Sequence, residues 1–112
     1  CWAAVSGVSA FGSYEGLGNA GTNVVVNDMG FKPKWLLVKN IDGTGTWPIH
    51  DSFRNDPDVE NTTYIDASTL DAEATTATYG VTFTSTGFTF DSGTTTSAMN
   101  TSGSTYIYMA FA

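Results

Sequence analysis

Residues 31–40 read FKPKWLLVKN and contain the apolar run Trp35-Leu36-Leu37-Val38. An unbroken run of this kind predicts a strand with both faces buried. The IDGTG segment at 41–45 predicts a turn, because Asp-Gly tolerates the left-handed backbone of a tight hairpin. Residues 46–54, TWPIHDSFR, then show the two-residue alternation of a second strand from Trp47 onward. The stretch therefore predicts two antiparallel strands joined by a short turn.

Strand signals recur about every ten residues on both sides of this hairpin, whereas only residues 68–76 are compatible with a helical turn. We therefore predict an all-β protein, a single antiparallel β-sandwich of about seven to nine short strands with at most one turn of helix. The further strands are expected at 10–14, 22–27, 62–67, 81–83, 88–90 and 105–112. The predicted core contains Trp35, Leu37, Ile49, Phe88, Phe90, Tyr106 and Tyr108.

The composition limits the partners of this domain. The chain has 112 residues, enough for one core, and a formal net charge of -7. Such an acidic surface repels phosphate backbones and anionic lipids, so we expect no nucleic-acid partner and no membrane insertion. The single cysteine, Cys1, excludes an internal disulfide and a cysteine-rich zinc site.

No residue pattern in the sequence predicts catalysis, so we expect no catalytic residues and no enzyme. His50, Asp51 and Ser52 have the residue types of a hydrolase triad, but adjacent strand residues point to opposite faces. Asp51 and Arg54 are better explained as a structural ion pair at a strand end. Trp35 and Trp47 could form a sugar-stacking platform, but their apolar, in-phase neighbours favour burial in the core.

Ligand binding is expected, if anywhere, in the polar loops at 41–46, 55–61 and 91–104, because loops on a rigid sandwich carry function. An acidic domain of this kind suits neutral or amino sugars better than sulfated ones. The candidate ligand-binding residues are Asp42, Asp56, Asp58 and Asn61, with His50 as a neighbour. No cofactor is predicted. Calcium is the one metal that the oxygen ligands of Asp56, Asp58, Glu60 and Asn61 would suit, although the segment lacks an EF-hand pattern.

The two ends of the sequence share a short pattern. Cys1-Trp2-Ala3 and Ala110-Phe111-Ala112 both read small, aromatic, alanine. Excision of one unit from a tandem array would leave such matching ends, although coincidence explains three positions equally well. We therefore expect residues 1–112 to be one unit of a longer repeat protein, with residues 1–3 lying beside 110–112 or completing a preceding unit.

Several blocks along the chain resemble a repeat found in bacteriophage proteins, notably those of marine phages. The blocks are FGSYEG at 11–16, GFKPKWLLVK at 30–39, WPIHDSFR at 47–54, GF at 87–88 and YIYMAFA at 106–112. The resemblance implies a concanavalin-like or jelly-roll sandwich in a tail fibre, tail spike or other virion protein. The sequence of this chain differs from the family pattern at Leu17-Gly18-Asn19.

The function expected from this resemblance is a non-enzymatic structural module of a virion appendage. Its partners would be neighbouring repeats or virion proteins, with a contribution to host attachment; the sequence does not predict its oligomeric state. One alternative is a carbohydrate-binding, lectin-like module that contacts a host-surface glycan. A second is a bacterial surface lipoprotein acylated at Cys1, which the bulky Trp2 next to it disfavours.

Overall fold

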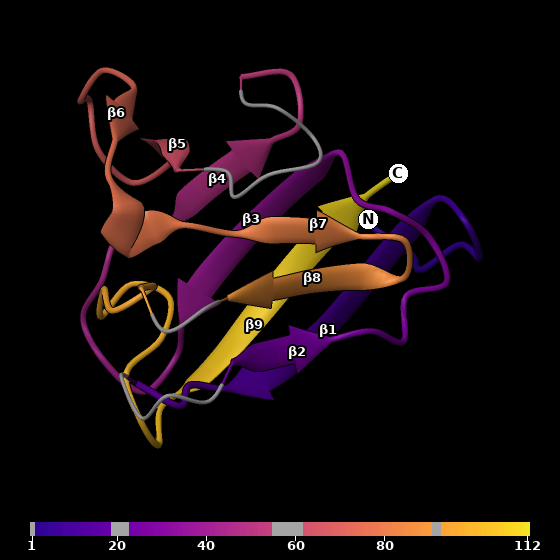
Figure 1. Ribbon diagram of the computed structural model, residues 1–112, viewed down its shortest axis with the longest axis horizontal. Helices are drawn as coiled ribbons and strands as arrows, with labels where there is room; N and C mark the ends of the chain where they lie inside the picture. The colour runs from indigo at the N-terminus through magenta and orange to yellow at the C-terminus, as the bar shows by residue number, and fades with distance from the viewer. Residues whose placement is uncertain (1, 19–22, 55–61, 91–92) are drawn as a thin grey trace.

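The computed structural model describes residues 2–18, 23–54, 62–90 and 93–112, and over these residues the chain is an antiparallel β-sandwich (Figure 1). The larger layer has six strands in the spatial order β1 (Ser9–Glu15), β9 (Thr105–Phe111), β3 (Trp35–Asn40), β4 (Pro48–Asp51), β5 (Thr63–Asp66) and β6 (Ala74–Thr75). The smaller layer has three strands in the order β2 (Val24–Val26), β8 (Gly87–Phe90) and β7 (Thr82–Thr84). The predicted fold class is confirmed.

Strand β9 lies between β1 and β3 and fixes which residues of the larger sheet share a face. Tyr106 pairs with Tyr14 of β1 and with Asn40 of β3. Because side chains alternate across a strand, Tyr106 and Tyr108 point toward the smaller sheet and are buried, whereas Ile107 points away and is 45% exposed. The larger sheet thus has an inner face against the smaller sheet and an outer face on the opposite side.

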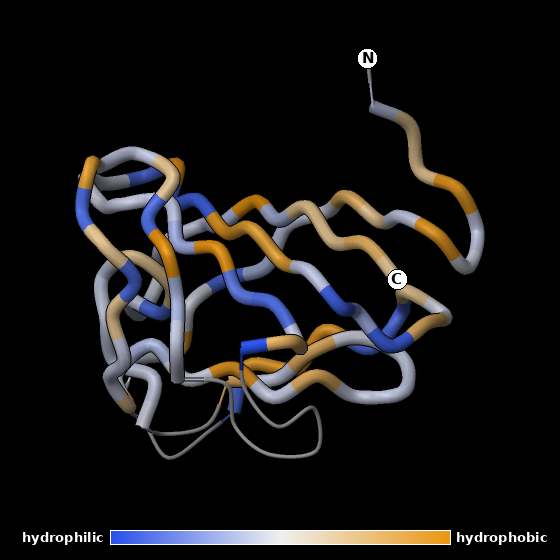
Figure 2. The backbone as a smooth tube through the Cα atoms, turned by 90° about the horizontal axis from the view of Figure 1, so that it is seen from above, coloured by the Kyte–Doolittle hydropathy of each residue, from blue (hydrophilic) through white to orange (hydrophobic). Residues whose placement is uncertain are grey.

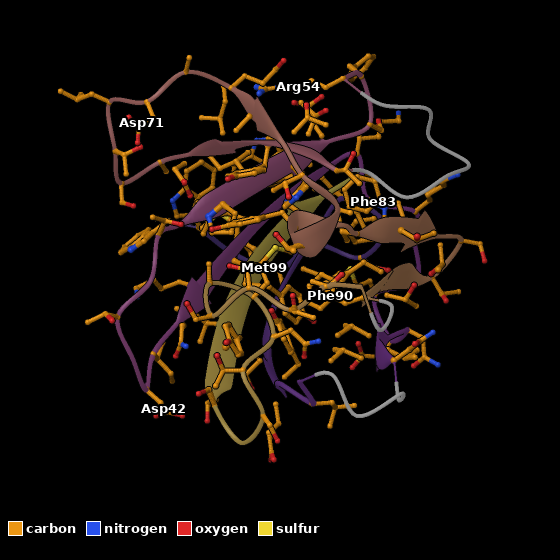
Figure 3. The ribbon with its side chains drawn as sticks, turned by 60° about the vertical axis from the view of Figure 1, so that its left-hand side comes forward. Asp42, Arg54, Asp71, Phe83, Phe90 and Met99 are labelled. Carbon is orange, nitrogen blue, oxygen red and sulfur yellow. The ribbon has the colours of Figure 1, made fainter. Side chains whose placement is uncertain are left out.

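The hydrophobic core lies between the two sheets. It is assembled from alternate positions of both layers, and its members are Val24, Val26, Leu36, Val38, Val81, Phe83, Phe88, Phe90, Ala98, Met99, Tyr106, Tyr108 and Ala110. Figure 3 shows Phe83, Phe90 and Met99 in this interior. The Tyr108 and Phe88 rings within it meet edge-on at a centroid distance of 5.4 Å, which is a favourable aromatic geometry.

Four of the seven predicted core residues, Phe88, Phe90, Tyr106 and Tyr108, are confirmed. The prediction was wrong for Trp35, Leu37 and Ile49, which lie half-buried on the outer face, and for Trp47, which is 43% exposed. Trp47 and Ile49 do share a face, as their spacing predicts. The inner positions of this segment are taken instead by Pro48 and His50.

The β3–β4 turn is where the sequence predicts it, but its geometry has a different origin. Gly43 is not among the described glycines with positive φ. Instead the buried Asn40 side chain accepts hydrogen bonds from the backbone N–H groups of Asp42 at 2.9 Å and Gly43 at 3.0 Å. Its amide nitrogen also donates to the carbonyl of Ser97 and to the Tyr106 hydroxyl, so one side chain ties the turn to the core.

The β7–β8 hairpin is confirmed, with Thr84 paired to Gly87. Gly87 lies so close to the Val26 carbonyl of β2 that the structure leaves no space for a Cβ atom there. The helical turn predicted at 68–76 was misplaced. That segment contains β6, and the short 3₁₀ helix η1 follows at Ala77–Tyr79.

The polar segment 93–104 closes one end of the sandwich rather than forming a solvated loop. Ala98, Met99 and Asn100 within it are buried. The Asn100 side chain accepts a hydrogen bond from the Leu17 N–H at 2.8 Å and donates to the Thr94 carbonyl at 2.7 Å. These bonds fasten the segment to the chain that follows β1.

The two chain ends approach each other on the outer face. Ser9 pairs with Phe111, and the Trp2 ring packs edge-on against the Phe111 ring at 5.7 Å. Residues 2–4 form no strand, and this segment runs out from the edge of the sandwich before the chain turns into β1 (Figure 2). The expected proximity of 2–3 to the C-terminal strand is therefore present as a ring contact.

Candidate functional site

The outer face of the six-stranded sheet is apolar. We call the following outward-pointing residues the outer sheet face: Phe11, Trp35, Leu37, Lys39, Trp47, Ile49, Ile107, Met109 and Phe111. They are half-buried among one another or, like Trp47 and Ile107, more exposed than that. An exposed patch of many large apolar side chains on one face of a sheet is characteristic of a surface that contacts another molecule.

Aromatic rings gather at the end of the face where β9 terminates. Phe111 lies in the middle, with ring centroids at 5.5 Å from Trp35, 5.7 Å from Trp2 and 6.2 Å from Phe11. The Phe11 and Phe111 planes are perpendicular. These contacts join the four rings into one aromatic cluster at this end of the face.

The other end of the face contains a shallow cavity of about 360 Å³. Its walls are Phe11, Leu37, Trp47, Ile107 and Met109, together with Lys39. The Lys39 ammonium lies 5.9 Å from the centroid of the Trp47 ring, within the range of a cation–π interaction. The tryptophan is therefore held against the sheet by a charge rather than by a covering element.

The edge of the outer face carries a charge network. Arg54 pairs with Asp51 at 2.6 Å and with Glu73 at 3.0 Å. The other Asp51 oxygen accepts hydrogen bonds from the backbone N–H groups of Phe53 and Arg54, each at 3.0 Å. The predicted ion pair of Asp51 and Arg54 is confirmed, and Asp51 also binds the loop backbone that follows it.

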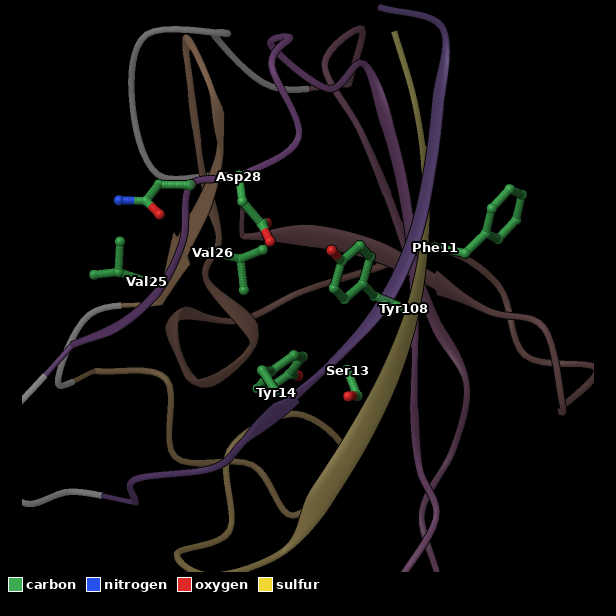
Figure 4. Close-up of a pocket in the computed structure, with 9 residues that line it drawn as sticks. Phe11, Ser13, Tyr14, Val25, Val26, Asp28 and Tyr108 are labelled. Carbon is green, nitrogen blue, oxygen red and sulfur yellow. The ribbon is translucent and has the colours of Figure 1, made fainter. Parts of the chain in front are cut away.

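A groove runs between the edge strands β1 and β2, where the two sheets are open (Figure 4). Two adjoining cavities, of about 310 and 340 Å³, share Phe11, Asp28 and Tyr108 among their walls. The Tyr108 ring crosses the neighbouring Gly12 of β1, where a Cβ atom would lie only 2.6 Å from the hydroxyl oxygen. The hydroxyl thereby reaches the groove, where burial and the Asp28 carboxylate raise the Tyr108 pKa.

His50 is completely buried under the inner face of β4. Its Nε2 donates a hydrogen bond to the Tyr79 carbonyl at 2.8 Å, and its Nδ1 has no partner among the described residues. Burial disfavours the imidazolium and lowers the His50 pKa to about 4. Asp51 points to the opposite face, so the exclusion of a His50-Asp51-Ser52 triad is confirmed.

The remaining predicted ligand residues do not form one site in the part of the chain that the structure describes. Asp42 is exposed in the β3–β4 turn, where its carboxylate accepts a hydrogen bond from the Thr105 N–H at 2.6 Å, which lowers the Asp42 pKa. Its partner in the prediction, His50, faces the interior and is closed to a surface ligand. Figure 3 shows Asp42 and Arg54 at opposite ends of the molecule. Asp56, Asp58, Glu60 and Asn61, and with them the predicted calcium ligands, lie outside the described residues, as does Cys1.

The described residues contain neither a metal-binding cluster of side chains nor a membrane-spanning helix. No group of three or more His, Cys, Asp or Glu side chains within 2–18, 23–54, 62–90 and 93–112 converges as metal ligands would. Over the same ranges no helix has the length and apolar character needed to cross a bilayer.

Sequence reasoning missed both surfaces. It assigned Trp35, Leu37, Trp47 and Ile49 of the outer sheet face to the core. The apolar run at 35–38 and the apolar alternation at 106–111 did indicate strands with two apolar faces. The groove has a weaker signal, Gly12 within an otherwise bulky strand. Neither signal identifies a molecule that binds to the outer sheet face or to the groove.

One comparison with known proteins assigns the whole chain to a family. A family model described as a domain of unknown function, DUF7483, matches residues 1–112. The chain belongs to the DUF7483 family. No curated protein and no solved structure matches it significantly. The outer sheet face and the groove are therefore candidate sites of a DUF7483 domain on their geometry alone.

Proposed function

We propose that the chain is a non-enzymatic structural module of a phage tail fibre or other virion appendage. It works by packing the outer sheet face against neighbouring protein. The observation that carries this proposal is the outer sheet face itself, on which Trp47 and Ile107 remain 43% and 45% exposed. A fibre built of many units needs such apolar contact surfaces between them.

The energetics support a role in assembly. Removing apolar surface from water contributes roughly 25 cal/mol per Å², so a face of large apolar side chains favours association once a partner covers it. The aromatic contacts around Phe111 fix these side chains in advance, which reduces the entropy lost on association. A preformed flat surface is suited to stable packing between units.

The chemistry of the described residues favours a structural role over a catalytic one. The single histidine of the sequence, His50, is sealed inside the sandwich and held neutral by its burial. The ion pairs of Arg54 bind strand ends to each other at the edge of the sheet. These charged and titratable groups stabilise the fold.

The virion setting is supported by the sequence blocks that resemble phage repeats, and it has a direct test. Particles of a phage that encodes the chain would be purified and labelled with an antibody against the 112-residue domain. We expect gold particles on an appendage in electron micrographs and peptides of the domain in the particle digest. Particles that contain neither would overturn the proposed function.

A lectin-like function is the second candidate, and the groove between β1 and β2 favours it. Tyr108 and Asp28 place a hydroxyl and a carboxylate around one cavity, which is donor and acceptor chemistry that a neutral sugar needs. A glycan array would be probed with the chain in calcium and in chelator. Saturable binding that is lost in Asp28→Ala and kept in Asp42→Ala would support this candidate.

A further inference from the structure

We infer that the outer sheet face binds the same face of a second copy of this chain, forming a symmetric pair of sandwiches. The inference deepens the proposed structural role and rests on it, because it names the partner that covers the face. It depends on three properties of the described residues: the shape of the face, the distribution of charge and the available area.

The shape of the face favours another sheet as its partner. The larger sheet already packs one face against a sheet, and two such layers pack about 10 Å apart when their apolar side chains interdigitate. The outer sheet face has the same construction, with Phe11, Met109 and Leu37 aligned across the adjacent strands β1, β9 and β3. A two-fold axis through this face applies the same patch of both copies to each other and closes the assembly at two copies.

The distribution of charge favours a second copy at this face over the rest of the surface. The chain carries a net charge of -7, so two copies repel each other through most orientations. All four Lys and Arg residues belong to the outer face or its rim: Lys39 on the face, Lys34 and Arg54 beside Trp35, and Lys32 next to Lys34. The Asp51 carboxylate there is neutralised by Arg54. Among the described residues, basic side chains therefore gather at this face, which lowers the repulsion between two acidic chains that meet there.

The area of the face sets the expected strength. The four strands that carry the face, β1, β9, β3 and β4, have 7, 7, 6 and 4 residues. At about 4.8 Å spacing and roughly 3.3 Å rise per residue, they cover on the order of 400 Å² in projection. Protruding side chains enlarge the accessible area toward the roughly 800 Å² per partner of a standard interface. We therefore expect a reversible dimer with a dissociation constant on the order of 10 µM.

Sedimentation equilibrium of the 112-residue chain tests the inference. Samples would span about 1 to 300 µM, which brackets the expected dissociation constant. Ile107→Glu places a charge on the outer face and should weaken association at least about tenfold. Val25→Glu is the matched control, because Val25 is 56% exposed on a strand of the smaller sheet. It should leave the dissociation constant within about twofold.

Trp47→Gln keeps the test decisive if Ile107→Glu fails to fold, because Trp47 is exposed and precedes β4. It too should weaken association, with a circular dichroism spectrum like that of the parent. A chain that stays monomeric to the highest concentration overturns the inference. So does a dimer that Val25→Glu disrupts and the two outer-face variants do not.

This outcome is separable from that of the proposed function. A domain that is present in virions but monomeric in isolation would overturn the pairing and leave the structural role standing. A domain that dimerises in solution but is absent from virions would overturn the proposed virion role and leave the pairing standing.

Discussion

The two faces of the six-stranded sheet are both apolar, yet only one is covered. On β3, Leu36 and Val38 point inward and are completely buried, whereas Trp35 and Leu37 point outward and are half-buried. The smaller sheet covers the inner face, and the described residues provide no equivalent layer for the outer one. Hydropathy therefore indicates which side chains tend to be buried. The position of a residue in the fold determines whether the domain itself covers that side chain.

Alanine substitutions at the adjacent residues Leu36 and Leu37 should differ most in the free energy of unfolding that they cost. Leu36→Ala opens a cavity in the core and should lower the free energy of unfolding by about 2–5 kcal/mol. Leu37→Ala removes a side chain that solvent already reaches and should lower it by roughly 1 kcal/mol. Urea unfolding of dilute samples, in which any dimer has dissociated, measures both. Equal losses would mean that the two faces are equally buried.

His50 on the inner side of β4 makes stability depend on pH. Its pKa is about 4 in the folded chain and about 6.5 when unfolded, so the unfolded chain binds more protons between these values. Stability is therefore fully present above pH 6.5 and falls as pH decreases toward 4, by up to about 3 kcal/mol. Urea midpoints across this range measure the loss.

A direct check follows the imidazole itself. NMR signals of His50 in the folded chain should titrate near pH 4, and His50→Gln should flatten the pH profile of stability above that value. Titration near 6.5 in the folded protein would contradict the buried, neutral histidine.

Substitution of Asn40 should cause the next largest loss of stability, because this side chain links the inner face to the β3–β4 turn. Asn40→Ala leaves the N–H groups of Asp42 and Gly43 without the acceptor that they have now. We expect a loss of about 1–3 kcal/mol in the free energy of unfolding, measured by thermal or urea unfolding. Asn27→Ala, at an exposed position after β2, is a matched control and should change it by less than about 0.5 kcal/mol. Similar effects of the two variants would refute the role given to Asn40.

Arg54 at the rim of the outer face gives the smallest effect. Its bonds to Asp51 and Glu73 are partly exposed and screened by solvent, so Arg54→Gln should cost less than about 1 kcal/mol in unfolding free energy. Repeating the measurement in high salt should shrink the difference further. A loss as large as that of Leu36→Ala would show that the rim, and not the core, anchors this corner of the sheet.

Much of the fold could be predicted from the sequence, because strand periodicity and turn residues are local properties. The β7–β8 hairpin and the pattern of β9 are examples. The face of each strand could not be predicted where both faces are apolar, which is why Trp35 and Trp47 were placed in the core. His50 adds to this error, since a polar side chain occupies an inner position that only its bond to the Tyr79 carbonyl makes tolerable.

The segment that closes the sandwich and the groove were less predictable for a different reason. Met99 and Asn100 lie in a polar run that is typical of a loop, but they are buried and hydrogen-bonded to residues more than 80 positions away. Long-range pairing of this kind leaves little local signal. The groove at Tyr108 likewise depends on the register between β9 and Gly12 of β1.

The three tryptophans provide the most direct test of the outer sheet face, because Trp35 and Trp47 belong to it and Trp2 packs against Phe111 within it. Acrylamide quenching of tryptophan fluorescence in the unmodified chain would be measured from about 1 to 300 µM, across the expected dissociation constant. If the face pairs with a second copy, quenching is strong in dilute samples and falls, with a blue shift of emission, as concentration rises. Quenching that is strong and independent of concentration, or already weak in the dilute sample, would contradict the account.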